Sequence, residues 1–321
     1  MKIVVVGAGA TGGMLGGYLA LAGEDVCLLD PYEAHMKACR ENGLTIKAAS
    51  FLSVNDVKEY NVKLNATTDA SEAGIADVVL FMPKGIHSRD AMPNALAVSD
   101  EHTVLLTMQN GLGNVEVISE YFDPERIACG ITSISSGLPE PGVVTPRIPA
   151  HNQVWIGAEN KALEPVLEQL AADFRKVGLE ATYDEDIITR IWEKFAMNCG
   201  VNAATSILRL TARNAAQFQD YIDIRQEVIR EVDAIAKKRG IYMNPRTIFG
   251  LGDVAVPLAQ SKSPDTYASM AQDAKAKRHT EIMSLNGYAA AEARRLGVAA
   301  PYNECLTKLV KVIEQAYDLQ F

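Results

Sequence analysis

The first thirteen residues, MKIVVVGAGATGG, constrain the fold of this chain most strongly. A β-branched run at residues 2–6 leads directly into three glycines, Gly7, Gly9 and Gly12. In a strand–turn–helix unit, the first glycine allows a tight turn, the second lets the backbone approach a pyrophosphate, and the third lets helix and strand pack closely. The opening helix also presents unpaired N–H groups to phosphates. The pattern therefore predicts a dinucleotide-binding turn rather than an ordinary strand–helix turn, formed by Gly7, Ala8, Gly9, Ala10, Thr11 and Gly12.

Asp30 follows the second apolar run, residues 25–29, close to the position of the acid that hydrogen-bonds ribose hydroxyls in such units. A carboxylate there repels a 2′-phosphate, and no Lys or Arg follows it until Lys37. This favours NAD(H) over NADP(H). The alternative is that Asp30 only caps a helix that begins near Glu33.

Two domains are expected for 321 residues, because single domains are usually about half that long. Apolar runs at 77–81, 103–107 and 126–130 continue the strand–helix alternation of a doubly wound α/β Rossmann sheet. From residue 186 onward the patterns are helical. We therefore predict a dinucleotide-binding domain at 1–183 and an all-helical substrate and catalytic domain at 184–321, with the join near the acidic cluster 183–186.

The net charge of −9 disfavours sequence-independent nucleic-acid binding, which needs cations to displace the counterions of phosphates. The N-terminal apolar run is shorter than the roughly 7–15 residues of a signal peptide, and no stretch approaches the roughly 20 residues of a membrane span. The five cysteines form no CxxC pair and are expected to be reduced thiols. A cytoplasmic protein without membrane or nucleic-acid partners is the expectation.

A polar stripe marks the helical segment IITRIWEKFAMNCGVNAATSIL. Lys194, Asn198 and Asn202 follow one another at intervals of four, so they share one helix face. Their neighbours Trp192 and Phe195 should be buried, and burying unpaired polar groups costs about 1–3 kcal/mol each. A polar ligand would compensate for this cost, although a solvated face is the simpler alternative.

Four other side chains are candidates. Lys84 and Asn110 follow predicted strands, and ligands of doubly wound sheets bind beyond the carboxyl ends of strands; a solvated loop lysine and a plain Asn-Gly turn are the alternatives. Ser269 and Glu281 resemble the polar face of a surface helix. On one straight helix they would lie about 18 Å apart, so they contact one small substrate only if the chain bends between them.

The chain resembles the ketopantoate reductases, also called 2-dehydropantoate 2-reductases, along nearly its whole length. The resemblance rests on the order and spacing of GAGATGG, the Lys84 loop, QNGLG around Asn110, WEKFAMNCGVN, SMAQD and RHTEIMSLNG. It implies an oxidoreductase of pantothenate biosynthesis, in which a small 2-oxo acid lies between a Rossmann and a helical domain and is reduced with NAD(P)H. No metal is required.

The resemblance also implies residue roles. Lys194 would be the general acid, and Glu281 would hydrogen-bond the substrate hydroxyl and steady the lysine. Asn198, Asn202 and Ser269 would hold the substrate, while Lys84 and Asn110 would act where cofactor and substrate meet. The family usually prefers NADPH and often carries a basic residue where Asp30 stands. Residues 146–152, with Arg147 and His151, match no functional pattern.

Other functions stay open at this point. An NAD-dependent D-2-hydroxyacid dehydrogenase of the mandelate type shares the expected architecture. A non-catalytic dinucleotide-binding sensor is a second alternative, but it would not need both Lys194 and Glu281. Helical domains of this kind often pair, so a homodimer is compatible with the sequence, although no unambiguous dimer face is visible.

Overall fold

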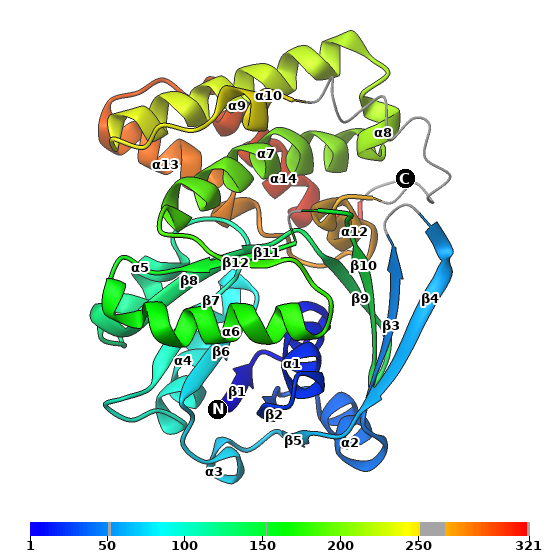
Figure 1. Ribbon diagram of the computed structural model, residues 1–321. Helices are drawn as coiled ribbons and strands as arrows, with labels where there is room; N and C mark the ends of the chain where they lie inside the picture. Colours follow the sequence, from blue (N-terminus) through cyan, green and yellow to red (C-terminus); the bar gives the residue numbers. More distant parts are fainter. Residues whose placement is uncertain (51–52, 152, 251–266, 320–321) are drawn as a thin grey trace. The chain divides into compact units, whose positions relative to one another are not determined.

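The computed structural model describes residues 1–50, 53–151, 153–250 and 267–319, and the chain forms two compact units (Figure 1). Unit 1 comprises residues 1–109 and 114–187, and unit 2 comprises residues 110–113 and 188–321. This division lies slightly beyond the expected join at 183–186. It also gives the short segment Asn110–Gly113 to unit 2, although both of its flanks in the sequence belong to unit 1.

Unit 1 is built on an eight-stranded sheet in the order β12-β11-β8-β7-β6-β1-β2-β5. Neighbouring strands are parallel except β8 and β11, which are antiparallel. The chain order reverses at β1, which lies between β2 and β6, as in a doubly wound fold. This confirms the predicted α/β fold class. The strands are β1 Lys2–Val6, β2 Asp25–Leu29, β5 Asn65–Thr67, β6 Val78–Phe81, β7 Val104–Thr107, β8 Ile127–Thr132, β11 Val154–Gly157 and β12 Ala181–Tyr183.

Helices bury both faces of this sheet, and the side chains of β1 alternate between them. Ile3 and Val5 share a core cluster with α1, α2 and α6, whereas Val4 and Val6 pack with α3, α4 and α5. A strand buried on both sides must be apolar throughout, which explains the continuous run KIVVV. The helices are α1 Ala10–Leu21, α2 Glu33–Asn42, α3 Ala70–Ala73, α4 Ser88–Ala97, α5 Asn114–Ser119 and α6 Glu164–Lys176.

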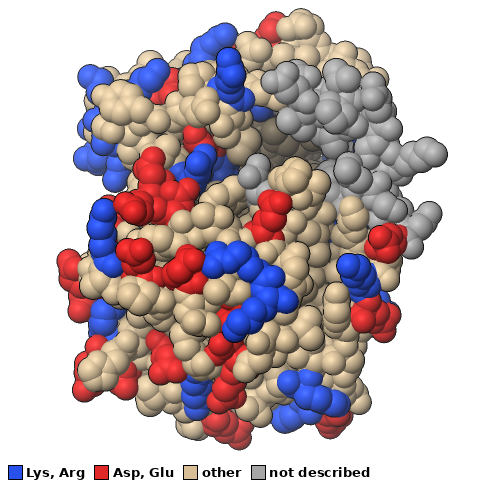
Figure 2. All heavy atoms as spheres, viewed as in Figure 1, with Lys and Arg blue, Asp and Glu red and all other residues tan. Residues whose placement is uncertain are grey.

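The outer face of α6 carries charged side chains. Arg175 pairs with Glu168 on this face, whereas Lys176 pairs with the buried Asp173. Figure 2 shows acidic and basic side chains intermingled on the face of unit 1 that bears this helix. An exposed pair such as Arg175 with Glu168 contributes at most about 1 kcal/mol, so the helix is held mainly by its apolar face.

A second sheet of four strands, in the order β4-β3-β10-β9, also belongs to unit 1. The sequence did not predict it, because β9 and β10 read SSGLPE and VVTPRI, and proline and glycine are depleted in strands. Part of the segment without a functional match, residues 146–148, lies in β10. The strands are β3 Leu44–Ser50, β4 Ser53–Val62, β9 Ser135–Glu140 and β10 Val143–Ile148.

Helix α1 packs between the two sheets. A Cβ atom on Gly16 would lie 2.8 Å from Val5 of the main sheet, and one on Gly17 would lie 2.7 Å from Leu44 of the second sheet. Gly12 through Leu19 are all buried. The glycines in ATGGMLGGYLAL thus let two sheets approach one helix from different sides, which explains why this helix has no polar face.

Unit 2 is helical, and its described residues contain no strand. Its core joins α7, α9 and α13 through residues such as Phe195, Val228 and Ala289. None of the helices in the described part of the chain is both long and apolar enough to cross a membrane. The helices are α7 Ile187–Leu208, α8 Ala212–Ala215, α9 Gln219–Lys238, α10 Pro245–Phe249, α12 Ser269–Lys275, α13 Asn286–Leu296 and α14 Pro301–Gln315.

The packing of α1 predicts that Gly17→Val destabilises unit 1. The new side chain would overlap Leu44 and Ile46, and overpacking of a core costs about 1–3 kcal/mol. Urea unfolding followed by circular dichroism should show a lower midpoint. The control is Leu21→Ala on the same helix, because Leu21 is exposed. An unchanged midpoint for Gly17→Val would contradict this account of the helix.

Candidate active site

The turn after β1 is closely packed on one side and open on the other. Gly7 has a φ of +88°, and a Cβ atom there would lie 2.4 Å from the Pro83 nitrogen in the loop after β6. A Cβ atom on Gly12 would lie 2.2 Å from the Gly7 carbonyl oxygen. At Gly9, however, no atom of the described residues beyond its immediate chain neighbours lies within 4 Å of the corresponding position. The turn therefore needs its first and third glycines for packing, whereas the second faces open space.

The N-terminus of α1 suits an anion. The helix begins at Ala10, no side chain caps it, and its first turn contains no acidic residue. Ala8 is buried, whereas Ala10 and Thr11 are partly exposed. Unpaired N–H groups and the helix dipole together favour a negative group at this end. These residues fit the pyrophosphate of a dinucleotide.

Asp30 lies at the same edge of the sheet as the glycine turn. Val6 pairs with Leu29, and the Gly7 N–H donates to the Leu29 carbonyl at 2.9 Å. The Asp30 carboxylate accepts from the Tyr32 N–H at 2.9 Å, and no Lys or Arg of the described residues forms an ion pair with it. Helix α2 begins after Tyr32 without a side-chain cap. Asp30 therefore shapes the turn before α2 and does not cap the helix.

The loop after β6 carries Lys84, which is exposed and precedes the short 3₁₀ helix Gly85–His87. Gln109 holds this loop: its Nε2 donates to the Pro83 carbonyl at 2.6 Å and to the Ser88 hydroxyl at 2.9 Å. The sequence interpretation assigned no role to Gln109. Its position directly before Asn110 in QNGLG was the available signal.

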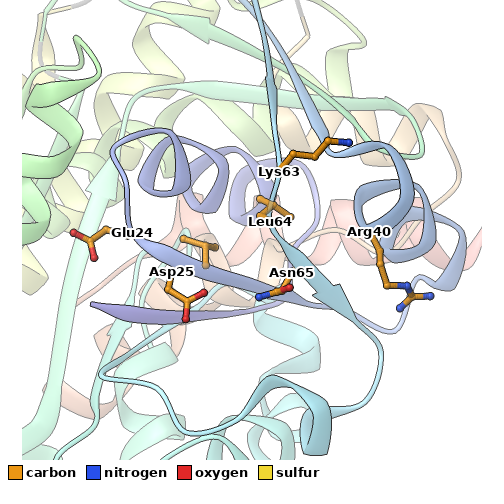
Figure 3. Close-up of a pocket in the computed structure, with 7 residues that line it drawn as sticks. Glu24, Asp25, Arg40, Lys63, Leu64 and Asn65 are labelled. Atoms are coloured by element: carbon orange, nitrogen blue, oxygen red, sulfur yellow. The ribbon is translucent and has the colours of Figure 1, made fainter.

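A pocket elsewhere in unit 1 is lined by Glu24, Asp25, Arg40 and Asn65, among others (Figure 3). Asp25 begins β2 and Asn65 begins β5, so the pocket lies at the amino ends of these parallel strands. Doubly wound sheets bind their ligands at the carboxyl ends. The pocket is therefore separate from the glycine turn.

Lys194 of α7 contacts Asn110 within unit 2. Its Nζ donates to the Asn110 Oδ1 at 2.9 Å, across 84 residues of sequence. Gly111 makes this contact attainable: its φ is +85°, and a Cβ atom there would lie 2.3 Å from the Ser284 carbonyl oxygen. That same carbonyl accepts the Leu112 N–H at 3.0 Å. Segment 110–113 is thus fixed on the 3₁₀ helix Ile282–Ser284.

The asparagines of the polar stripe have different surroundings. Asn202 is 5% exposed, and its Oδ1 accepts from the Ser269 hydroxyl at 3.2 Å and from the Met270 N–H at 3.4 Å. It therefore fixes the start of α12 and orients Ser269. Asn198 is partly exposed, and its side-chain amide makes no hydrogen bond to the described residues. The amide of Asn198 can receive a polar ligand without breaking an existing contact.

Ser269 and Glu281 do not share one straight helix. Helix α12 ends at Lys275, Lys277 has a φ of +53°, and Glu281 directly precedes the 3₁₀ helix Ile282–Ser284. The bend that a common substrate would require is therefore present. The charge of Glu281 lies near enough to raise the pKa of Lys194.

Burial has the larger effect on Lys194 and acts in the opposite direction. It lowers the pKa to about 8, because removing the amine from water disfavours its charged form. An amine of this kind can donate or accept a proton near neutral pH. With Asn110 as its acceptor and Glu281 as its neighbouring charge, Lys194 is equipped for proton transfer to a polar ligand.

His151 and Arg147, which the sequence left unassigned, take part in surface and sheet contacts. The His151 Nδ1 lies 2.9 Å from a carboxylate oxygen of Glu180, and both side chains are exposed. Arg147 pairs with Ala49 and Ser135 within the second sheet. These contacts explain the two residues as parts of the fold of unit 1.

Comparisons with known proteins follow the same division of the chain. The family described as ketopantoate reductase PanE/ApbA matches residues 3–161, and its C-terminal counterpart matches residues 186–314. A 2-dehydropantoate 2-reductase of Pyrococcus horikoshii is 33% identical over 98% of each chain, and one of Streptococcus pyogenes is 29% identical over 100% of each chain.

Solved structures similar to this chain include a D-mandelate dehydrogenase and a ketopantoate reductase. A D-mandelate dehydrogenase with NADH and anilino(oxo)acetate has a TM-score of 0.86 at 26% identity, covering 99% of this chain and 100% of that one. A PanE/ApbA family ketopantoate reductase from Ralstonia eutropha has a TM-score of 0.83 at 26% identity, covering 98% and 99%. The similarity therefore extends over both units.

The electrostatics of Lys194 predict that Glu281→Gln lowers its pKa further below about 8, because the neighbouring negative charge that favours the ammonium is lost. NMR titration of protein labelled with ¹⁵N-lysine measures the shift, and Lys194→Ala identifies the signal. Glu185→Gln is the control, since Glu185 pairs with Lys161 instead. A pKa of Lys194 that does not change in Glu281→Gln would rule out this coupling.

Proposed function

Because this chain belongs to the ketopantoate reductase family and is an oxidoreductase, we propose that it reduces a 2-oxo acid to the 2-hydroxy acid with a nicotinamide dinucleotide. The observation that carries the proposal is the partly buried Lys194 amine, bound to Asn110 and with a pKa of about 8. Ketopantoate is the proposed substrate, because the curated relatives are 2-dehydropantoate 2-reductases. The reaction would then belong to pantothenate biosynthesis.

Unit 1 binds the dinucleotide in this proposal. The uncapped start of α1 and the open space at Gly9 support pyrophosphate binding. Asp30 would accept hydrogen bonds from the ribose hydroxyls and repel a 2′-phosphate, so NADH is the proposed cofactor rather than NADPH. Lys84, at the carboxyl end of β6, would contact the cofactor from the neighbouring loop. When bound, the nicotinamide supplies a hydride to the carbonyl carbon of the substrate.

Unit 2 supplies the proton. Negative charge develops on the carbonyl oxygen as its carbon is reduced, and the Lys194 ammonium stabilises this charge before donating its proton to the oxygen. The Asn110 Oδ1 orients the ammonium through their 2.9 Å hydrogen bond. Glu281 favours the protonated amine and would hydrogen-bond the substrate hydroxyl. The lysine then regains a proton from water.

Three other side chains of unit 2, Asn198, Ser269 and Asn202, would bind the substrate or position a residue that does. With respect to the described residues, the Asn198 amide has donors and an acceptor available for a carboxylate or hydroxyl group. Ser269, held by Asn202, would add a hydroxyl contact. Asn202 thus acts mainly by positioning Ser269, because its own oxygen is already occupied.

A second candidate function is NAD-dependent D-2-hydroxyacid dehydrogenation. Two observations favour it: the acidic residue Asp30 at the cofactor edge, and the similarity to a D-mandelate dehydrogenase solved with NADH. The proton-transfer chemistry of Lys194 is the same in both cases and runs in reverse for oxidation. The two functions therefore differ in substrate side chain and direction, not in acid–base machinery.

The cysteines support a cytoplasmic location for this reaction. All five are free thiols, and four of them are buried. Free thiols suit a reducing compartment, where disulfides rarely persist.

The proton-donor role predicts that Lys194→Ala lowers kcat for 2-oxo acid reduction by about 10²–10⁴-fold. The cofactor Kd should stay within about twofold, because Lys194 belongs to unit 2. In the unmutated protein, reductive kcat/KM should fall as the pH rises through about 8, since only the ammonium can donate. Lys161→Ala on the surface is the control. A fully active Lys194→Ala protein would refute the role of Lys194 as the proton donor.

The substrate assignment predicts that ketopantoate is reduced faster with NADH than benzoylformate or 2-oxoisovalerate. Steady-state rates for the three oxo acids, each with NADH and with NADPH, test substrate and cofactor together. Asp30→Ala should weaken the NADH preference, because the repulsive carboxylate is removed. Preference for benzoylformate would favour the mandelate-type function, and preference of the unmutated protein for NADPH would overturn the role of Asp30.

A further inference from the structure

His35 of α2 is completely buried beside the glycine turn. Its Nε2 lies 3.1 Å from the Ala8 carbonyl oxygen, and its Nδ1 receives the Gly142 N–H at 2.8 Å. Gly142 lies in the turn that joins β9 and β10 of the second sheet. One imidazole ring therefore connects α2, the dinucleotide turn and the second sheet.

These partners determine where the proton of His35 lies. The Gly142 N–H can only donate, so Nδ1 must be the acceptor and carry no proton. The proton of the neutral ring is then on Nε2, which donates to the Ala8 carbonyl. Burial lowers the pKa of His35, while the Ala8 contact and the charge of Asp30 act in the opposite direction. The ring is neutral, with a fixed tautomer.

The contact with Ala8 orients the next peptide group. All described peptide bonds are trans, so the Ala8 carbonyl and the Gly9 N–H point in opposite directions. Because the carbonyl is turned toward the buried ring, the Gly9 N–H faces away from it. Gly9 is also the glycine of the turn with open space around its Cβ position. His35 thus controls which side of the Ala8–Gly9 peptide is available to a ligand.

The backbone of His35 is linked to the turn that contains Asp30. The His35 backbone N–H donates to the Tyr32 carbonyl at 3.0 Å, and the Tyr32 backbone N–H donates to Asp30. The two parts of the proposed cofactor site, the glycine turn and the Asp30 turn, therefore meet at His35. The ring of His35 contacts the first part and its backbone contacts the second.

We propose that His35 is a positioning residue for dinucleotide binding: its Nε2–H, held in place by Gly142 of the second sheet, orients the Ala8–Gly9 peptide toward the pyrophosphate. This rests on the proposed function, because it assumes that the glycine turn binds a dinucleotide. It gives the second sheet a role in cofactor affinity, although none of the predicted cofactor residues lies on that sheet.

Two substitutions test the hydrogen bonds of the His35 ring to Ala8 and to Gly142 separately. A glutamine can place its Nε2 where the histidine Nε2 lies, so H35Q keeps a donor for the Ala8 carbonyl. An asparagine can place its Oδ1 near the histidine Nδ1, so H35N keeps an acceptor for Gly142 and loses the donor to Ala8. C39A is the packing control, because Cys39 is buried beside His35 and is not needed for either bond.

Fluorescence titration of the full chain with NADH and with NADPH measures the effect. H35N should raise the cofactor Kd by about fivefold or more, the usual effect of one lost hydrogen bond, while H35Q and C39A stay within about twofold. The kcat at saturating cofactor should not change in any of the three. Equal weakening in H35N and H35Q, or no weakening in either, would overturn the proposal.

A measurement on the unmutated protein covers the case in which H35N does not fold. Two-dimensional NMR of ¹⁵N-histidine-labelled protein, with His35 assigned through H35Q, should show the Nε2–H tautomer and a shift of this signal when NADH is added. An Nδ1–H tautomer, or a signal that NADH does not move, would overturn the role of His35. If the unmutated protein binds neither NADH nor NADPH, the proposed function itself fails.

Discussion

The hydrogen bond between the Lys194 amine and the Asn110 side chain is the contact on which the proposed chemistry of this protein depends. It joins two segments that lie 84 residues apart, and it places the amine where burial holds its pKa at about 8. An exposed lysine would stay charged but would be surrounded by water, which weakens its field. A fully buried lysine without an acceptor would lose its proton. Asn110 and the charge of Glu281 let the Lys194 amine be shielded from water and still be protonated near neutral pH.

Glycine determines the architecture around both halves of the proposed reaction. In unit 1, Gly7 and Gly12 let the turn after β1 pack against the loop after β6, and Gly16 and Gly17 let two sheets pack against α1. In unit 2, Gly111 lets the Asn110 segment rest on the Ser284 carbonyl. At each of these positions a Cβ atom would lie less than 3 Å from a neighbouring atom. The absence of a side chain thus serves packing at these sites as much as turn formation.

The sequence predicted the parts of the fold that depend on local patterns. The run KIVVV, the glycine turn and the helical second half follow from periodicity and spacing, and the fold class is confirmed. The second sheet was missed because SSGLPE and VVTPRI lack a strand pattern. Contacts between residues far apart in the sequence also could not be predicted, because local patterns carry no information about them. Asn202 bonds Ser269 across 67 residues, His35 meets Gly142 across 107, and the bend after α12 uses a positive φ at Lys277, a residue type that carries no turn signal.

Because Asn110–Gly113 belongs to unit 2, the protein cannot be divided into two fragments that match its units. The chain passes between the units three times, after residues 109, 113 and 187, so no single cut separates them. A fragment ending at residue 187 would expose Leu112, which packs on the core of unit 2, and a fragment starting at residue 188 would contain Lys194 without Asn110. During synthesis, moreover, Asn110 emerges long before the helix that it must meet. The proposed proton-transfer centre therefore depends on the whole chain, and we expect neither half to work when it is expressed alone.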